Sequence, residues 1–125
     1  MVTHYRDLHV WRKALDWTEA VYNLTAGWPR EERFGLISQV RRSAISVASN
    51  IAEGAARRTT GEFVQFVGIA QGSLAEAETQ LTLAQRLGYL GSGEARELLG
   101  AASEISRMLA GLATSLHRRK AAGPK

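Results

Sequence analysis

Two stripes of residues with helical spacing run through positions 37–57. The first recurs at steps of three and four positions, as one side of an α-helix does, and is apolar: Ile37, Val40, Ala44, Val47 and Ile51. The second lies on the opposite side and is polar but mostly small: Gln39, Ser43, Ser46, Asn50, Glu53 and Arg57. Solvated helix faces usually carry long Lys and Glu side chains, whereas small side chains let another backbone come close. We therefore expect this helix to pack within its own subunit on one side and against another molecule on the other.

The same spacing of apolar residues predicts four helices along the chain. The chain has only two prolines, Pro29 and Pro124, and the stretch between them is rich in good helix formers. The predicted helices cover about residues 7–26, 30–54, 59–88 and 92–118, followed by a frayed tail at 119–125. Because the connections are short, successive helices should alternate in direction. The predicted fold is all-α, an antiparallel up-and-down four-helix bundle that forms a single domain over residues 1–125.

Individual residues predict where these helices begin and end. Asp7 is a candidate N-cap for the first helix, and Ser92 for the fourth. Gly54 is expected to end the second helix. Thr59 and Glu62 have the three-residue spacing of a capping box, which predicts the start of the third helix.

One charged residue of the second helix falls inside its apolar arc. If the second and third helices form an antiparallel hairpin, the numbers of facing residues sum to roughly 115, which places Arg41 and Arg42 beside Ser73 and Glu76. We expect a partly buried ion pair between Arg41 and Glu76. The alternative is that Arg41 extends along its own apolar stem to reach solvent.

The residues that usually carry chemistry are absent or badly spaced. The chain has no Cys, which excludes disulfides, thiolate metal sites and cysteine nucleophiles. Metal sites in bundles use Glu-x-x-His, yet none of His4, His9 and His117 follows a Glu by three positions. No sequence position supplies an evident base for a serine nucleophile. We therefore expect no catalytic residue, no metal and no cofactor, with an enzyme whose site lies between subunits as the remaining alternative.

The amino-terminal sequence MVTHYRDLHVWRK has no apolar signal core. No window of 18 residues is apolar and uncharged, as a membrane-spanning helix requires. We expect a cytoplasmic protein with no membrane partner.

Charge is modest overall, with a formal net charge of +4, but an up-and-down bundle would distribute it unevenly. One end would gather three acidic residues, Asp7, Glu53 and Glu62, and eight basic ones: Arg6, Arg12, Lys13, Arg57, Arg58, Arg118, Arg119 and Lys120. Such an end can bind phosphate backbones in a non-specific, salt-dependent way. The alternative is that the basic carboxyl-terminal residues complement the negative pole of the last helix and keep the protein soluble.

Seven segments, taken together, resemble one known family. They are DLHVWRKA at 7–14, FGL at 34–36, QVRRSAISVASNIAEG at 39–54, RR at 57–58, EFVQF at 62–66, IAQGSLAEAETQL at 69–81 and LGYL at 87–90. In order and spacing they are similar to the four-helix-bundle proteins encoded by intervening sequences in bacterial large-subunit ribosomal RNA genes. The resemblance covers about residues 7–118. A related branch is the accessory variability-determinant protein of diversity-generating retroelements.

The resemblance implies a four-helix bundle that assembles into a ring, a homopentamer, with no established enzymatic activity. In the retroelement branch, the basic pentamer binds nucleic acid and partners a reverse transcriptase. This chain is only mildly basic by comparison, so the expected binding is weak. The location of such genes inside a ribosomal RNA gene is not evidence of a ribosomal function.

The function predicted from these observations is that of a non-enzymatic, ring-forming scaffold with a weak affinity for RNA or DNA backbones. Its expected partners are copies of itself, nucleic acid, and a reverse transcriptase if one is encoded nearby. The predicted nucleic-acid contacts are Arg57, Arg58, Arg118, Arg119 and Lys120. The predicted assembly contacts are Trp17, on the outer side of the first helix, with Ser43, Ser46, Ser49 and Asn50. The alternative is a purely structural or protein-partner module without a nucleic-acid role.

Overall fold

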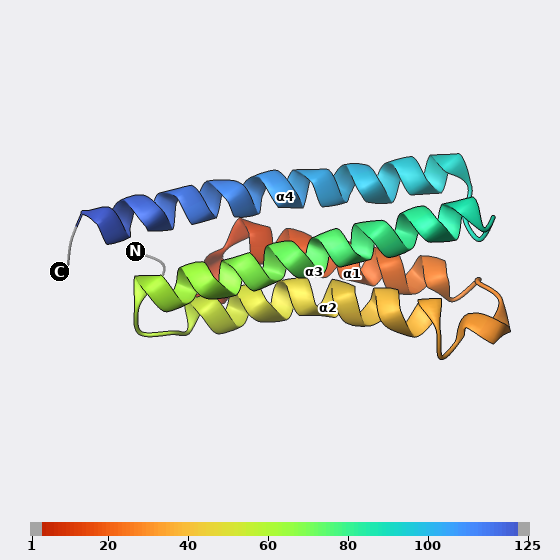
Figure 1. Cartoon of the computed structure of the whole chain (residues 1–125), viewed down its shortest axis with the longest axis horizontal. Coiled ribbons are helices and arrows are strands. Elements are labelled where there is room, and N and C mark those ends of the chain that lie inside the picture. Colours follow the sequence, from red (N-terminus) through yellow and green to blue (C-terminus); the bar gives the residue numbers. More distant parts are fainter. Residues whose placement is uncertain (1–3, 123–125) are drawn as a thin grey trace.

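The computed structural model describes residues 4–122, which form four α-helices and no strand. The helices are α1 (His9–Thr25), α2 (Leu36–Ala55), α3 (Thr60–Arg86) and α4 (Ser92–Ala121), with short 3-10 turns at Tyr5–Asp7 and Arg30–Glu32. Successive helices run in opposite directions with their axes nearly aligned (Figure 1). The α1–α2 and α3–α4 connections lie at one end, and the α2–α3 connection lies at the other, beside the start of α1 and the end of α4. The predicted all-α four-helix bundle is confirmed.

Each helix packs against two neighbours around one apolar core. The α2–α3 contact is the most extensive, α3 also contacts α4, and α1 contacts both α2 and α4. All five apolar residues of the stripe predicted at 37–51 are buried. The largest completely buried side chains come from α2, α3 and α4: Ile51, Leu74, Leu81, Ile105, Leu109 and Leu116. Burying one side chain of this size contributes about 1.5–3 kcal/mol, so this core stabilises the bundle.

Thr59 caps the start of α3 as predicted, but the Glu62 carboxylate bonds to the Thr59 hydroxyl and not to its backbone N–H. The hydroxyl of Thr59 accepts a hydrogen bond from the Glu62 backbone N–H at 3.1 Å and donates one to the Glu62 carboxylate, also at 3.1 Å. Two other predicted caps are wrong. The N-cap of α1 is Leu8, because Asp7 belongs to the preceding 3-10 turn. Ser92 is already the first residue of α4, whose N-cap Gly91 donates its N–H to Glu94 Oε1 at 3.0 Å.

Gly54 does not end the second helix, since α2 continues to Ala55. It is buried, and a Cβ added to it would lie 2.8 Å from Phe66 Cβ and 2.9 Å from Phe63 Cδ1. The lack of a side chain is what lets α3 approach α2 at this point. Because Gly54 is itself helical and packs against α3, it serves close packing and not chain reversal.

The second helix also begins later than predicted. Residues 30–32 form a 3-10 helix and residues 33–35 a turn, and α2 starts only after Gly35, whose backbone is not helical. The predicted bounds of 30–54 place Glu32 inside the first turn of this helix. Instead, its Oε1 atom accepts the backbone N–H of Leu36 at 3.0 Å. Glu32 therefore stabilises the start of α2 from outside the helix.

The fourth helix is longer than predicted. It extends to Ala121, so the expectation of a frayed tail is wrong for residues 119–121. The last residues of that tail, 123–125, lie outside the described residues. Because the helix continues, Arg119 and Lys120 are held on a regular backbone.

The predicted Arg41–Glu76 ion pair is wrong. Arg41 Nε donates to Thr25 Oγ1 at 2.8 Å, and Arg41 Nη2 donates to the Tyr22 carbonyl at 3.1 Å. Its guanidinium carbon also lies 4.4 Å from the centre of the Tyr22 ring. Arg41 therefore faces α1, where its charge satisfies the last turn of that helix. Glu76 belongs to α3 and is exposed, and it lines a groove together with Arg42 of α2.

Candidate functional site

Basic residues converge at the end of the bundle where α2 turns into α3. Arg57 and Arg58 follow the last turn of α2, Thr60 opens α3, and Arg119 comes from the last turns of α4. Together they border a recess of ≈ 130 Å³, lined by Ala55, Arg57, Arg58, Thr59, Thr60, Phe63 and Arg119. Residues more than 60 positions apart in the sequence thus share one small site.

Three of the five predicted nucleic-acid contacts border this recess, and two do not. Lys120 lies over the first turn of α3, with its Nζ atom 3.5 Å from the position that a Cβ would take on Gly61. Arg118 is exposed on α4 and does not line the recess. The five residues therefore lie at one end of the molecule, but only Arg57, Arg58 and Arg119 surround the same space.

The arginines of the recess are engaged to different degrees. Arg57 Nη2 donates to Glu53 Oε2 at 2.8 Å, and its guanidinium carbon lies 4.7 Å from the centre of the Phe66 ring. Arg58 is exposed and makes no hydrogen bond or ion pair with residues 4–122. Glu53 thus offsets part of the charge of Arg57, while the charge of Arg58 faces solvent.

The basic residues of α1 are used within the molecule. Lys13 pairs with Glu104 of α4, and this hydrogen bond holds the pKa of the Glu104 carboxyl below its ordinary value. Arg12 Nη1 donates to the Arg6 carbonyl at 2.7 Å. Glu104 therefore offsets the charge of Lys13, whereas Arg12 keeps its charge while it is held against the Arg6 carbonyl.

The small polar stripe of α2 faces α3 of the same chain. Ser43 is only 8% exposed, and the hydroxyls of Ser46 and Ser73 lie 2.8 Å apart. Asn50 Nδ2 donates to both the carbonyl and the hydroxyl of Ser46, at 2.8 and 2.9 Å. The small side chains do let another backbone come close, as predicted, but that backbone is α3. The stripe is therefore not by itself an indication of a second subunit.

Trp17 does not lie on the outer side of α1, so its predicted placement is wrong. Its side chain is 3% exposed, and its Nε1–H donates to the Leu98 carbonyl of α4 at 3.0 Å. A buried indole usually finds such a partner. Trp17 is part of the core and is not available to another molecule.

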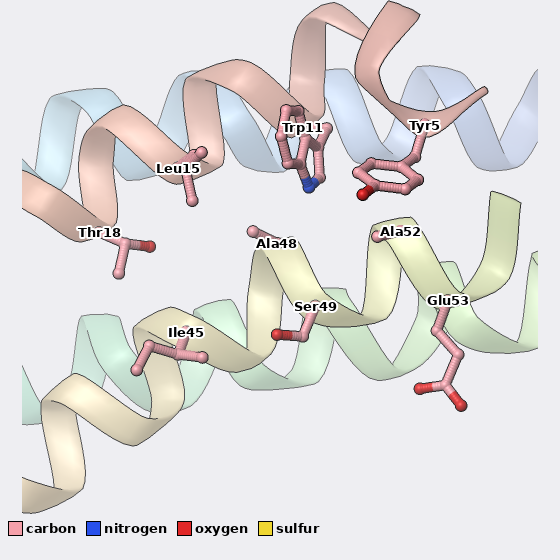
Figure 2. A pocket seen from close by; sticks show the side chains of 9 residues that line it. All are labelled: Tyr5, Trp11, Leu15, Thr18, Ile45, Ala48, Ser49, Ala52 and Glu53. Atoms are coloured by element: carbon pink, nitrogen blue, oxygen red, sulfur yellow. The ribbon is translucent and has the colours of Figure 1, made fainter. Parts of the chain in front are cut away.

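An apolar groove runs between α1 and α2, with a volume of ≈ 420 Å³. Figure 2 shows Trp11 and Leu15 on the α1 side facing Ala48 and Ile45 on the α2 side. Leu15 is 47% exposed and Ile45 43% exposed, although the sequence places both on apolar helix sides. The remaining lining residues are Tyr5, Thr18, Ser49, Ala52 and Glu53. Of the predicted assembly residues, Ser49 lies in this groove and is exposed.

The opposite end of the bundle is joined by polar and aromatic contacts. Tyr89 donates its hydroxyl hydrogen to Glu32 Oε2 at 2.8 Å, and the Trp28 and Tyr89 rings are 5.8 Å apart. Hydrogen bonds from the Leu36 N–H and from Tyr89 lower the pKa of Glu32, and the same carboxylate raises the pKa of Tyr89. These contacts connect the α1–α2 loop to the α3–α4 turn, where Gly88 adopts a positive φ of 81°.

Among residues 4–122, no three or more acidic or histidine side chains gather closely enough to hold a metal ion. No helix formed by these residues has both the length and the apolar character needed to cross a membrane.

Comparison with known proteins identifies the family. The family model described as 23S rRNA-intervening sequence protein matches residues 6–111. A crystal structure of a protein of unknown function from the S23 ribosomal protein family of Bacteroides thetaiotaomicron VPI-5482 has the same fold, with a TM-score of 0.75 at 22% identity. That match covers 83% of this chain and 97% of the other. No curated protein matches. Since the family model spans most of the four helices, the chain belongs to the 23S rRNA-intervening sequence protein family.

Proposed function

We propose that the protein is a non-enzymatic oligomeric scaffold that binds the backbone of RNA or DNA through its basic end. The observation that carries this proposal is the convergence of Arg57, Arg58 and Arg119 on one recess. Arginine forms charge-assisted, bidentate hydrogen bonds with phosphate oxygens. A single basic end binds weakly, but several copies in one assembly act together through multivalency.

The proposed assembly face is the groove between α1 and α2. Scattered apolar residues on a surface are normal, but Leu15 and Ile45 are exposed across one groove, next to Trp11. Covering such a groove with another subunit removes apolar area from water. The ring, a homopentamer, is the form that the family resemblance implies. The groove lies along the side of the bundle, which leaves the basic recess accessible in the assembly.

The nucleic-acid part is tested by titrating a labelled generic duplex and a structured RNA with the protein at two salt concentrations, read out by fluorescence anisotropy. We expect binding at low salt that weakens as salt rises, with a slope of about −0.9 for each phosphate neutralised in duplex DNA. The absence of binding at low salt would instead support the purely structural module.

The assembly part is tested by light scattering on the purified protein. We expect a mass of several subunits for the wild-type chain, and a lower mass for the double variant Leu15→Ser with Ile45→Ser. The double variant Leu83→Ser with Thr79→Ser is the matched control, because both residues are exposed on α3 and Leu83 is 47% exposed. A wild-type monomer at all concentrations would contradict the proposed ring.

A protein partner is the second candidate, and one observation favours it. Phe34 is 86% exposed beside Arg33, at the end of the bundle opposite the recess. An exposed aromatic residue is typical of a contact with another protein. A reverse transcriptase encoded next to this gene would be the first partner to test, by co-purification with the wild-type chain and with a Phe34→Ser variant. Both functions suit a cytoplasmic protein, which is the location we propose.

A further inference from the structure

The recess at the basic end is much smaller than a pocket for an organic ligand. Its volume is ≈ 130 Å³, whereas small-molecule pockets usually start at about 300 Å³. With about 30 Å³ for each water molecule, it holds roughly four waters. Space of this size matches a single phosphate group and is too small to enclose a nucleoside.

The walls of the recess are suited to an anion. Arg57 and Arg58 enter from the α2–α3 turn, and Arg119 enters from α4, so the positive charges come from two sides. Phe63 and Ala55 supply an apolar wall, against which charge interactions are less screened than in water. The recess therefore combines several guanidinium groups with one apolar wall.

The start of α3 adds hydrogen-bond donors. The Thr59 hydroxyl is already used by its hydrogen bonds with Glu62, so it is not free to bind a ligand. Thr60 also lines the recess, and its hydroxyl makes no hydrogen bond with residues 4–122. The first N–H groups of a helix lack partners within it, and they carry its positive pole. Thr60 is thus the neutral donor that complements the arginines.

We infer that this recess binds a terminal phosphate, the phosphomonoester at the end of a nucleic-acid strand. An internal phosphodiester is linked to a sugar on each side. It cannot enter a small recess unless both sugars approach with it. A terminal phosphate has three free oxygens and a charge of about −1.5 to −2 at neutral pH, so it can enter and use more than one guanidinium. This inference rests on the proposed nucleic-acid function and narrows it to strand ends.

The test compares single-stranded oligonucleotides of one sequence with a 5′-phosphate, a 3′-phosphate or hydroxyl groups at both ends. A hydroxyl-ended oligonucleotide two nucleotides longer controls for the added charge. We expect the wild-type protein to bind one phosphorylated form about tenfold more tightly than either hydroxyl-ended form, which is the effect of about one charge-assisted hydrogen bond. The two phosphorylated forms show which strand end is bound.

Variants connect that preference to the recess. Arg58→Gln and Thr60→Val should each reduce the preference for a phosphorylated end several-fold. Arg118→Gln removes the same charge from an exposed residue outside the recess and should leave the preference unchanged, although it weakens binding of all oligonucleotides. Equal losses in Arg58→Gln and Arg118→Gln would overturn the assignment of the recess.

The outcomes separate this inference from the proposed function. Equal, salt-dependent binding of phosphorylated and hydroxyl-ended strands would overturn the inference and leave the proposed function intact. Inorganic phosphate provides a test without nucleic acid, read out from the backbone NMR signals of Thr60 and Gly61. We expect these signals to shift on titration with phosphate and not with equal ionic strength of chloride. Unchanged signals would overturn the inference even if nucleic acid binds.

Discussion

Both ends of the bundle join antiparallel helices, but they use charge differently. At the end with the α1–α2 and α3–α4 connections, Glu32 is held by the Tyr89 hydroxyl and the Leu36 N–H, so its charge serves the fold. At the other end, Arg57 pairs with Glu53, whereas Arg58 makes no ion pair with residues 4–122. The first arrangement satisfies a charge internally, and the second leaves positive charge facing solvent. The difference indicates which end is available for an anionic partner.

The largest expected effect follows from removing the charges of the recess. The triple variant Arg57→Gln, Arg58→Gln and Arg119→Gln should bind duplex DNA at low salt about a hundredfold more weakly, if each exposed charge contributes about 1 kcal/mol. The slope of log affinity against log salt should become less steep by about three. Fluorescence anisotropy at several salt concentrations measures both quantities.

The opposite end supplies the control for this comparison. The variant Arg30→Gln, Arg33→Gln and Arg96→Gln removes the same net charge from exposed residues there. We expect its affinity and salt slope to stay close to those of the wild-type protein. If the two triple variants lose affinity equally, net charge decides binding and the contrast between the ends has no functional meaning.

The next effect concerns the packing that supports the recess. Gly54→Ala should destabilise the protein by about 1–3 kcal/mol, because the added Cβ collides with the side chains of Phe63 and Phe66. Gly72→Ala is the matched control, since nothing lies within 4 Å of its added Cβ on α3. That change should stabilise the protein by up to about 1 kcal/mol through helix propensity. Urea unfolding of the two variants measures the difference, and equal stabilities would show that α3 does not approach α2 closely at Gly54.

The smallest effect is a pH dependence at the opposite end. The pKa of Glu32 is lowered in the folded protein below its ordinary value of 4.5, chiefly by the hydrogen bond from Leu36. Its contribution to stability is therefore present above pH 4.5 and is lost as the pH falls through the lower folded value. Between pH 6 and 3, the melting temperature of the Glu32→Gln variant should fall less than that of the wild-type protein. Circular dichroism measures both melting temperatures. Glu97→Gln, at an exposed residue, is the control. If the melting temperatures of both variants fall equally with pH, the hydrogen bonds of Glu32 do not contribute to the pH dependence of stability.

Local patterns allowed the helices to be predicted, because periodicity and capping depend on residues close in sequence. The apolar stripe at 37–51 is buried, and Thr59 caps the start of α3 as expected. Helix ends were less predictable where a longer-range contact decides them. Gly54 has the residue type of a helix stop, but its close neighbour Phe66 lies on another helix.

The choice of neighbour could not be predicted from helical spacing. Arg41 lies inside the apolar arc of its helix, and spacing does not tell whether α1 or α3 covers that part of the arc. Small residues such as Ser46 indicate a close backbone but not which chain provides it. To predict that Trp17 is buried, one would need to know that its indole reaches the Leu98 carbonyl on α4, 81 positions later in the sequence. For the recess, the sequence indicated a basic end, but the convergence of Arg119 with Arg58 depends on how far α4 continues.

The contact between Glu53 and Arg57 connects the two surfaces proposed for function. Glu53 lines the apolar groove, and Arg57, one helical turn later, lines the basic recess. A subunit that takes up the Glu53 carboxylate at the groove would release the Arg57 guanidinium for phosphate, and a phosphate that attracts Arg57 would release Glu53. By thermodynamic linkage, each event then favours the other to the same extent. Self-association and anion capture would in that case be cooperative, and the protein would respond to a narrow range of its own concentration.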